Sequence, residues 1–301
     1  MGSPPPAHRV HLLEAGSTRQ LGAIARRGGP WRRVTFPALV AVIEHPDGVV
    51  VVDTGYSPRA VAAASRGLSR VYRALLPVTI DPTRTLAAQL DRLGLGPVTD
   101  VVVTHLHLDH VGGLADVLDV AAEGPEPRVV LDRAALATFR ATRGWAALVR
   151  GWVPGTVPDA VDRLAVDPSD LPQADGAWAD LGPLPGGRDV LGDGSVVVVP
   201  LDGHADGHLG VLVRARGAAG DGGGDDVDDV DLLLVGDAAW DVRAITDGAL
   251  PAAPVRLISH DWSTYTATID ALGDLRRRRP GLVVLPSHDE AAIRRVRDVL
   301  A

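Results

Sequence analysis

Short apolar runs rich in valine and leucine recur along the chain, and they alternate with stretches whose apolar residues have helical spacing. The runs predict strands at 10–13, 38–44, 49–52, 101–104, 128–131, 189–191, 195–201, 209–213, 232–235 and 282–285. The helical spacing predicts helices at 86–93, from 111 onward, and at 133–143, 264–275 and 290–300. This alternation indicates an α/β protein.

Turn and cap residues define how some of these elements begin and end. Residues 45–48 (His-Pro-Asp-Gly) have turn chemistry and predict a hairpin between two strands. The returning strand ends at Asp53, so this carboxyl group is expected at a strand terminus and not on a solvated face. Thr83 or Asp81 is expected to cap the helix that begins near Leu86.

The pattern predicts a single domain over residues 1–301, with two interruptions. Between about 144 and 187 the periodicity weakens, and Trp145 and Trp152 lie among prolines and glycines. This insertion either walls a pocket or anchors a long surface loop, and the pattern does not choose between the two. Residues 216–231 are rich in glycine and aspartate and are expected to form a disordered loop.

Charge and hydropathy narrow the range of partners. The formal net charge of −8 disfavours nucleic acid, because binding a polyanion requires a basic surface. The one concentrated basic run, 276–279, is expected at the solvated end of a helix, where the helix dipole favours cations. No apolar run is long enough to span a membrane, and the first residues lack the pattern of a secretory signal. We therefore expect a cytoplasmic protein that acts on a small molecule.

The segment His105-Leu-His107-Leu-Asp109-His110 follows the apolar run 101–104 and carries the chemistry of a metal site. In an extended segment His105 and His107 point to the same face, while Asp109 and His110 lie where the next helix begins. Cysteine is absent from the chain, so every metal ligand must be histidine, aspartate or glutamate. Imidazoles and carboxylates without thiolate suit zinc, or manganese, iron or cobalt in the same cage.

Three further polar residues follow predicted strands, namely His204, Asp237 and His288. Each by itself is more often a cap or a satisfied polar residue than a ligand. Because the carboxyl ends of strands gather along one edge of a sheet, the three are expected to converge on the first motif. Together with the histidine-rich motif, the three residues favour one shared metal site over unrelated structural roles.

These motifs resemble those of the metallo-β-lactamase superfamily of dinuclear metallohydrolases. The resemblance rests on the histidine-rich motif, on Gly203-His204-Ala205-Asp206-Gly207-His208, on Asp237 and His288, and on the early Asp53-Thr54-Gly55. It implies an αββα sandwich, in which two mixed sheets lie face to face with helices outside. The implied first metal is held by His105, His107 and His204, and the second by Asp109, His110 and His288. Asp237 is implied to bridge both metals, and Asp53 and His208 to orient ligands.

The resemblance also implies a mechanism, in which two divalent ions, Zn²⁺ above all, share a bridging hydroxide that attacks a carboxylic ester or lactone. Asp109 and Asp237 are the implied catalytic carboxylates, with Asp237 passing a proton to the leaving group. The chain is most similar to N-acyl homoserine lactonases. It differs from them in having Trp240 three positions after the bridging aspartate, where they have tyrosine, and Ala205-Asp206 where they have Thr-Pro.

Other functions remain open at this point. A thioesterase related to glyoxalase II, an iron redox enzyme similar to sulfur dioxygenases, and a non-catalytic binding protein are the alternatives, and a homodimer is left open. The candidate substrate contacts are Trp240, His260, Trp145 and Trp152. His8, His11, His45 and His260 are expected to have structural roles, with His260 a candidate proton donor should it lie in the pocket.

Overall fold

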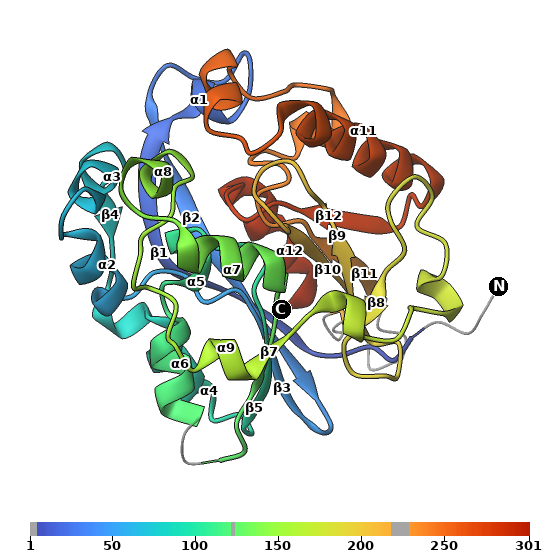
Figure 1. Cartoon of the computed structure of the whole chain (residues 1–301). Coiled ribbons are helices and arrows are strands. Elements are labelled where there is room, and N and C mark those ends of the chain that lie inside the picture. Colours follow the sequence, from blue (N-terminus) through green and yellow to red (C-terminus); the bar gives the residue numbers. More distant parts are fainter. Residues whose placement is uncertain (1–4, 122–123, 218–228) are drawn as a thin grey trace.

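The computed structural model describes residues 5–121, 124–217 and 229–301. Two β-sheets lie face to face, and helices cover their outer sides (Figure 1). The seven-stranded sheet has the order β4-β1-β2-β3-β5-β6-β7. Its strands are β1 (Val10–Leu21), β2 (Arg33–His45), β3 (Gly48–Val52), β4 (Val78–Thr79), β5 (Val98–Val102), β6 (Arg128–Val130) and β7 (Ala165–Val166).

The five-stranded sheet has the order β12-β11-β10-β9-β8. Its strands are β8 (Arg188–Asp189), β9 (Val196–Pro200), β10 (Leu209–Ala215), β11 (Val230–Leu234) and β12 (Leu282–Leu285). Both sheets mix parallel and antiparallel pairs, since β3, β5, β6 and β7 run parallel while β1, β2 and β3 alternate. In the second sheet β11 and β12 are parallel, and β9, β10 and β11 are antiparallel.

The helices and 3₁₀ turns connect these strands. The helices are α1 (Gly22–Ala25), α2 (Pro58–Ala64), α3 (Ser69–Leu75), α4 (Leu86–Leu93), α5 (Leu108–Val111), α6 (Leu114–Ala121), α7 (Arg133–Ala141), α8 (Gly144–Val149), α9 (Val161–Leu164), α10 (Arg243–Thr246), α11 (Trp262–Arg278) and α12 (Glu290–Leu300). The 3₁₀ turns are η1 (Pro82–Arg84), η2 (Pro168–Asp170), η3 (Gly176–Trp178) and η4 (Ala253–Leu257).

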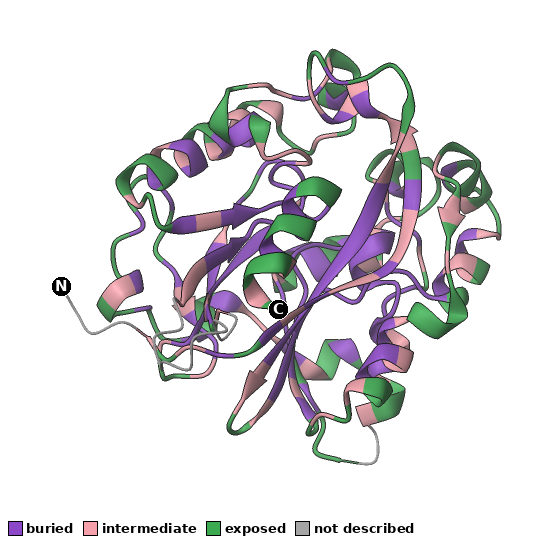
Figure 2. Ribbon diagram, turned by 180° about the vertical axis from the view of Figure 1, so that it is seen from behind, coloured by how far each residue is buried: buried purple, intermediate pink, exposed green. Residues whose placement is uncertain are grey.

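Burial explains why β3 is an unbroken run of valines. Val50 and Val52 pack between the sheets with residues such as Val211. Val49 and Val51 face the other way and pack with residues of α4 and α6, such as Leu86. A strand covered on both faces has no solvated side and therefore no polar alternation. Figure 2 shows this distribution, with buried residues in the sheets and exposed residues on the outer faces of the helices.

The layer order is therefore helices, sheet, sheet, helices, and the predicted αββα sandwich is confirmed. The outer face of the seven-stranded sheet packs against α4, α6, α7 and α9. The outer face of the five-stranded sheet packs against α10 and α11. α12 contributes Ile293 and Val296 to the core between the sheets. Among the described residues, no helix is long and apolar enough to cross a membrane.

Several predicted elements differ from the structure. β1 extends to Leu21, well past the predicted 10–13, because its polar second half pairs with β2 across a bulge after Glu14. The cap of α4 is Thr85, and not Thr83 or Asp81, because Asp81 caps the preceding turn η1. α2 and α3 have no counterpart among the predicted elements.

The stretch 144–187 contains short elements, and β7 within it pairs with β6. Arg279 holds this stretch to the end of α11, since its guanidinium donates to the carbonyl oxygens of Ala177 and Asp180, both at 2.7 Å. Of the predicted loop 216–231, residues 218–228 lie outside the described residues, and the last two residues belong to β11.

Candidate metal centre

The centre is built on two turns that hold each other. Asp53 directly follows β3 and has a left-handed backbone, with φ at 59°. Its neighbour Thr54 donates its amide N–H to the carbonyl oxygen of His110 at 2.7 Å. Gly113 lies so close to this turn that an added Cβ would come within 2.4 Å of the Thr54 carbonyl oxygen. Asp53 is held in a costly conformation by these contacts, as is common at functional sites.

The histidine-rich motif lies in a turn and a short helix. β5 ends at Val102 and α5 begins at Leu108, so His105 and His107 lie in the turn between them. The backbone at His107 is extended. The two imidazoles meet, with His105 Nε2 lying 2.9 Å from His107 Nδ1.

The first cluster of ligand atoms contains His105, His107, His204 and Asp237. His204 follows β9, and its Nε2 lies 3.2 Å from His107 Nδ1 and 3.4 Å from Asp237 Oδ2. His107 Nε2 donates to the carbonyl oxygen of Arg150 at 2.8 Å, which leaves Nδ1 as the nitrogen with a free lone pair. Each imidazole therefore turns one nitrogen toward a common point.

The second cluster contains Asp109, His110 and His288, all of them buried. His110 Nδ1 donates to Asp53 Oδ2 at 2.7 Å, and His288 Nδ1 donates to the carbonyl oxygen of Pro37 at 2.7 Å. Both residues thus keep Nε2 free as the ligand atom. His288 Nε2 lies 3.4 Å from Asp109 Oδ2, and His110 Nε2 lies 3.8 Å from Asp109 Oδ1.

Asp237 lies between the two clusters. Its Oδ2 lies 3.4 Å from His204 Nε2, and its Oδ1 lies 3.3 Å from His110 Nε2. His288 Nε2 is near both oxygens, at 3.1 Å from Oδ1 and 3.2 Å from Oδ2. The backbone N–H of Asp237 donates to His208 Nε2 at 3.1 Å, so His208 holds the loop that carries the carboxylate. Asp53 and His208 are thus placed beside the ligands, each one hydrogen bond away from a residue of a cluster.

Burial sets the protonation of the first cluster. It is the main reason why the pKa values of His105, His107 and His204 lie below the usual imidazole value. Burial also lowers the pKa of His208, to about 3. These imidazoles are therefore neutral at pH 7, which is the state in which histidine binds a metal.

Carboxylates set the protonation of the second cluster. Burial lowers the pKa of His110, but Asp53, Asp109 and Asp237 outweigh it and raise that pKa well above the usual value. The pKa of His288 is also raised, because Asp237 outweighs the effect of burial. In return, His288 and His110 overcome burial and hold the pKa of Asp237 well below its usual value.

The donor set fits divalent metal ions. The buried Nε2 of His110 and Oδ1 of Asp237 have no hydrogen-bond partner among the described residues, although leaving such atoms unpaired is costly. A cation between these atoms would satisfy both. Imidazole nitrogens and carboxylate oxygens are the ligands expected for zinc and its neighbours.

The affinity of the second cluster for zinc is expected to rise more steeply with pH than that of the first. A cation must displace the protons held by His110 and His288, whose raised pKa values favour the charged form. The imidazoles of the first cluster have no proton to lose at neutral pH. Competition titrations with a chromophoric chelator, from mildly acidic to mildly alkaline pH, measure both affinities. Parallel pH profiles for the two ions would contradict this expectation.

A cavity of about 370 Å³ opens above both clusters. Its floor is formed by ligands of both clusters, including Asp109, Asp237 and His288. Its walls come from segments far apart in sequence and include Ile24, Phe36, Tyr56, Tyr72, Leu75, Leu76, Leu148, Val149, Trp240 and Ile258. Most of these wall residues were not predicted, since α3 and the second half of β1 were missed. In the sequence, Tyr56 could have been recognised as a wall residue, because it directly follows the Asp53-Thr54-Gly55 turn.

Trp240 lines this cavity, but its polar group is already used. Its Nε1–H donates to Asp237 Oδ2 at 2.8 Å, so the indole restrains the shared carboxylate. The ring therefore offers an apolar surface to a bound molecule, while its N–H serves the metal centre.

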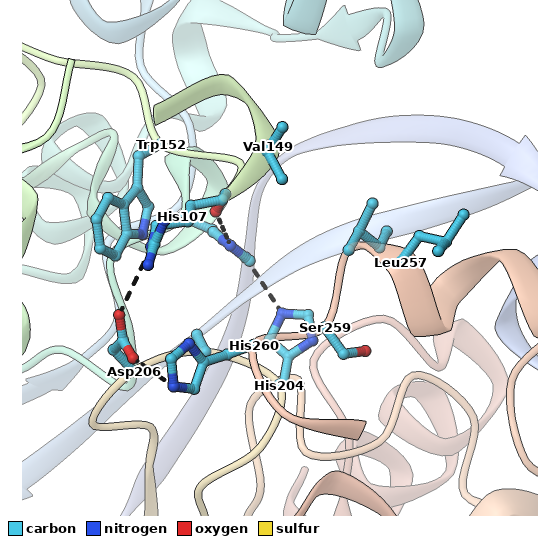
Figure 3. Close-up of a pocket in the computed structure, with 11 residues that line it drawn as sticks. His107, Val149, Trp152, His204, Asp206, Leu257, Ser259 and His260 are labelled. Atoms are coloured by element: carbon cyan, nitrogen blue, oxygen red, sulfur yellow. Dashed lines mark hydrogen bonds and ion pairs between the residues drawn. The ribbon is translucent and has the colours of Figure 1, made fainter. Parts of the chain in front are cut away.

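A smaller cavity of about 160 Å³ adjoins His107 and His204 (Figure 3). Two of the candidate substrate contacts, Trp152 and His260, line it, and His260 Nε2 lies 2.7 Å from Asp206 Oδ1. Trp145 lines neither cavity, and 65% of its side chain is exposed. The structure thus brings three of the four candidate substrate contacts to the site.

Comparisons with known proteins agree with this geometry. The model of the metallo-β-lactamase superfamily matches residues 33–288. A probable metallo-hydrolase of Mycobacterium tuberculosis is 27% identical over 97% of this chain and 84% of its own length. The N-acyl homoserine lactonase AttM of Rhizobium johnstonii is 27% identical over 94% of both chains. A solved N-acyl homoserine lactone hydrolase with N-hexanoyl-L-homoserine at its catalytic metal centre has a TM-score of 0.66 at 15% identity, covering 96% of this chain and 97% of that one.

The fold and the two clusters define a metallohydrolase of αββα architecture. The chain belongs to the metallo-β-lactamase superfamily, as the sequence motifs predicted. The prediction of a metal-dependent hydrolase is therefore confirmed. Relatives named as N-acyl homoserine lactonases are among the proteins similar to this chain.

Proposed function

We propose that this protein is a dinuclear metal-dependent hydrolase of carboxylic esters or lactones that carry an apolar acyl group. One observation carries the proposal: a carboxylate shared by two ligand clusters lies on the floor of a largely apolar cavity. His105, His107 and His204 would hold one ion, Asp109, His110 and His288 the other, and Asp237 both. Two such ions, zinc being favoured, would supply Lewis acidity and would lower the pKa of a bound water.

The side chains around the two clusters then orient the reacting groups. Asp237 lies between the two clusters and contacts ligands of both, so it is placed to take a proton from the attacking water. Trp240 fixes the orientation of Asp237 through its N–H. The cavity walls exclude bulk water from the reacting carbonyl group, which strengthens the electrostatic interactions around it.

The wall of the cavity favours an apolar acyl group. Val149 and Ile258 border both cavities, and 60% and 52% of these side chains is exposed, so apolar surface continues outward from the site. Figure 3 shows Val149 and Leu257 on either side of the smaller cavity. A cavity of this size and character is typical of sites for small organic ligands.

The same wall disfavours glutathione thioesters, the substrates of the glyoxalase II alternative, because an anionic peptide needs cationic partners. Among the described residues, Arg150 is the only arginine that lines the larger cavity. Its guanidinium carbon already lies 5.5 Å from the centre of the Trp152 ring, and its Nε lies 3.9 Å from Asp206. The relatives named as N-acyl homoserine lactonases support an acylated lactone as the first substrate to test.

The test is a substrate panel combined with metal analysis. Protein purified without chelator is analysed for metals by mass spectrometry and assayed with acyl lactones of increasing chain length, aryl esters, glutathione thioesters and phosphodiesters. Two ions per chain and a kcat/KM that rises with acyl length are expected. A preference for phosphodiesters or glutathione thioesters, or full turnover with one iron and consumption of oxygen, would overturn the proposal.

Trp240→Phe is expected to weaken metal binding by about tenfold, because partners that orient ligands typically contribute 10–100-fold in affinity. The phenyl ring keeps an apolar wall but cannot donate to Asp237 Oδ2. KM for an apolar ester should change little, while kcat at low metal concentration falls. Metal titration together with steady-state kinetics separates the two effects.

Trp262→Phe is the matched control for this substitution. Trp262 is a half-buried tryptophan at the start of α11 that packs against Tyr265, with ring centres 5.6 Å apart. It makes no hydrogen bond to a metal ligand in the described structure, so its replacement should leave metal affinity unchanged. Equal losses in both variants would show that the indole N–H of Trp240 has no special role.

A further inference from the structure

A second group of potential ligands lies at the other end of β3 from Asp53. His8 precedes β1, His45 ends β2 just before the hairpin, and Asp193 lies in the turn between β8 and β9. One ligand atom from each of the three residues lies within 4.8 Å of the others. Three segments that are distant in sequence therefore bring two imidazoles and a carboxylate together, apart from the centre described above.

His8 supplies the clearest sign that a ligand belongs here. Its Nδ1 donates to the carbonyl oxygen of Glu44 at 3.0 Å, so its Nε2 carries the free lone pair. The residue is only 6% exposed, and this Nε2 is buried without a hydrogen-bond partner among the described residues. A buried acceptor without a donor costs free energy that a bound cation would recover.

The other two side chains are oriented by their own hydrogen bonds. His45 Nδ1 accepts the backbone N–H of Asp47 at 3.1 Å, which directs Nε2 toward Asp193 Oδ2 at 3.0 Å. Asp193 Oδ1 accepts from the backbone N–H and the hydroxyl group of Ser195, at 2.9 and 2.6 Å. Oδ2 is thus the oxygen left for a ligand, and the rings of His8 and His45 lie with centres 5.0 Å apart.

We propose that His8, His45 and Asp193 bind one zinc ion at a site separate from the catalytic centre. Two imidazoles and one carboxylate are a known three-residue zinc set, and the remaining position is left for water. For zinc to bind His45 Nε2, the imidazole proton moves to Nδ1, where the Asp47 carboxylate, 3.8 Å away, replaces the Asp47 backbone N–H as its partner. Nε2 and Asp193 Oδ2 are then both free to become ligands.

The protonation state of His8 agrees with this role. Burial, reinforced by the nearby His45, lowers the pKa of His8 below the usual imidazole value. The ring is therefore neutral at pH 7 and needs no proton removed before binding. Arg216 is the nearby cation that opposes a metal ion, and its guanidinium donates to the carbonyl oxygen of Ala7 at 3.2 Å.

Zinc at this site would join three parts of the fold. It would tie the segment before β1 to the hairpin of β2 and β3 and, across the sandwich, to the turn before β9. Because it binds the folded state and not the unfolded chain, it stabilises the protein by mass action. The proposed role of this ion is therefore to stabilise the fold, and hydrolysis at the centre described above should not depend on it.

The test counts zinc ions in the whole protein. Metal-stripped wild type, Asp193→Asn and His8→Gln are equilibrated with micromolar free zinc, and bound zinc is measured by mass spectrometry after removal of excess ion. Each variant is expected to bind one ion fewer than wild type and to lose the zinc-dependent rise in Tm that this site contributes. The readout is a difference of one ion, so it holds whatever number the catalytic centre binds.

His11→Gln is the matched control, since His11 is a neighbouring histidine that pairs with Glu44 at 2.6 Å and lies outside the cluster. It should bind as many ions as wild type. Should His8→Gln fail to fold, Asp193→Asn decides, because an amide oxygen can still accept from Ser195. Equal zinc content in wild type and Asp193→Asn, or an equal loss in His11→Gln, would overturn the proposal.

Discussion

Replacing Asp109 with alanine is expected to lower the metal content from two ions to one and to reduce kcat/KM by about a thousandfold or more. A thousandfold loss corresponds to about 4 kcal/mol of transition-state stabilisation. Asp109 is the only carboxylate of the second cluster that is not shared, and its oxygens lie 3.4 Å from His288 and 3.8 Å from His110. Without it, only two imidazoles with raised pKa values and the shared Asp237 remain to bind the second ion.

The fold should survive this change. Asp109 caps no helix and makes no hydrogen bond in the described structure that another element depends on, and the two sheets keep their own cores. Metal analysis, kinetics and thermal unfolding of the same preparation separate loss of the ion from loss of the fold. Asp116→Ala is the control, because Asp116 is a half-buried aspartate on the adjacent helix α6, where it faces Arg59. Wild-type turnover in Asp109→Ala would refute a dinuclear mechanism.

Replacing Asp53 with asparagine is expected to weaken the second metal by about 10–100-fold, the range typical of partners that orient metal ligands. Asparagine tolerates the left-handed backbone at this position, so the change tests the carboxylate alone. Asp53 Oδ1 accepts from the backbone N–H of Thr104 at 2.8 Å, and Oδ2 accepts from His110 Nδ1 at 2.7 Å.

An amide has only one oxygen, and the backbone N–H of Thr104 needs it. The NH₂ group of asparagine would then face His110 Nδ1, which must become an acceptor, so the imidazole proton moves to Nε2. Nε2 is the atom that the second cluster offers to the ion. Metal titration measures the loss, and excess metal should restore much of kcat. Unchanged affinity in Asp53→Asn, relative to Asp116→Asn as control, would show that Asp53 does not set the tautomer.

The local parts of the structure could be predicted because their signals are local. β12 and α12 begin and end at the predicted residues, since a short apolar run and a strongly amphipathic helix need little from the rest of the chain. The motif from His105 to His110 identified a metal site through side-chain chemistry and close spacing alone. The strand before the motif ends at Val102 and not at the predicted residue 104, where Thr104 donates its backbone N–H to Asp53.

The sequence by itself determined the alternation of strands and helices, the residue types that can bind a divalent ion, and the resemblance that grouped them into two sets. The tertiary structure decided how these parts meet. Only packing between distant segments showed that Trp240 donates to Asp237, that an apolar cavity opens above the clusters, and that His8 lies beside His45 and Asp193. The periodicity of apolar residues shows which side of an element is buried. A contact between two elements depends instead on how the sheets twist and pack, and the residues next to it in sequence carry no signal of that packing.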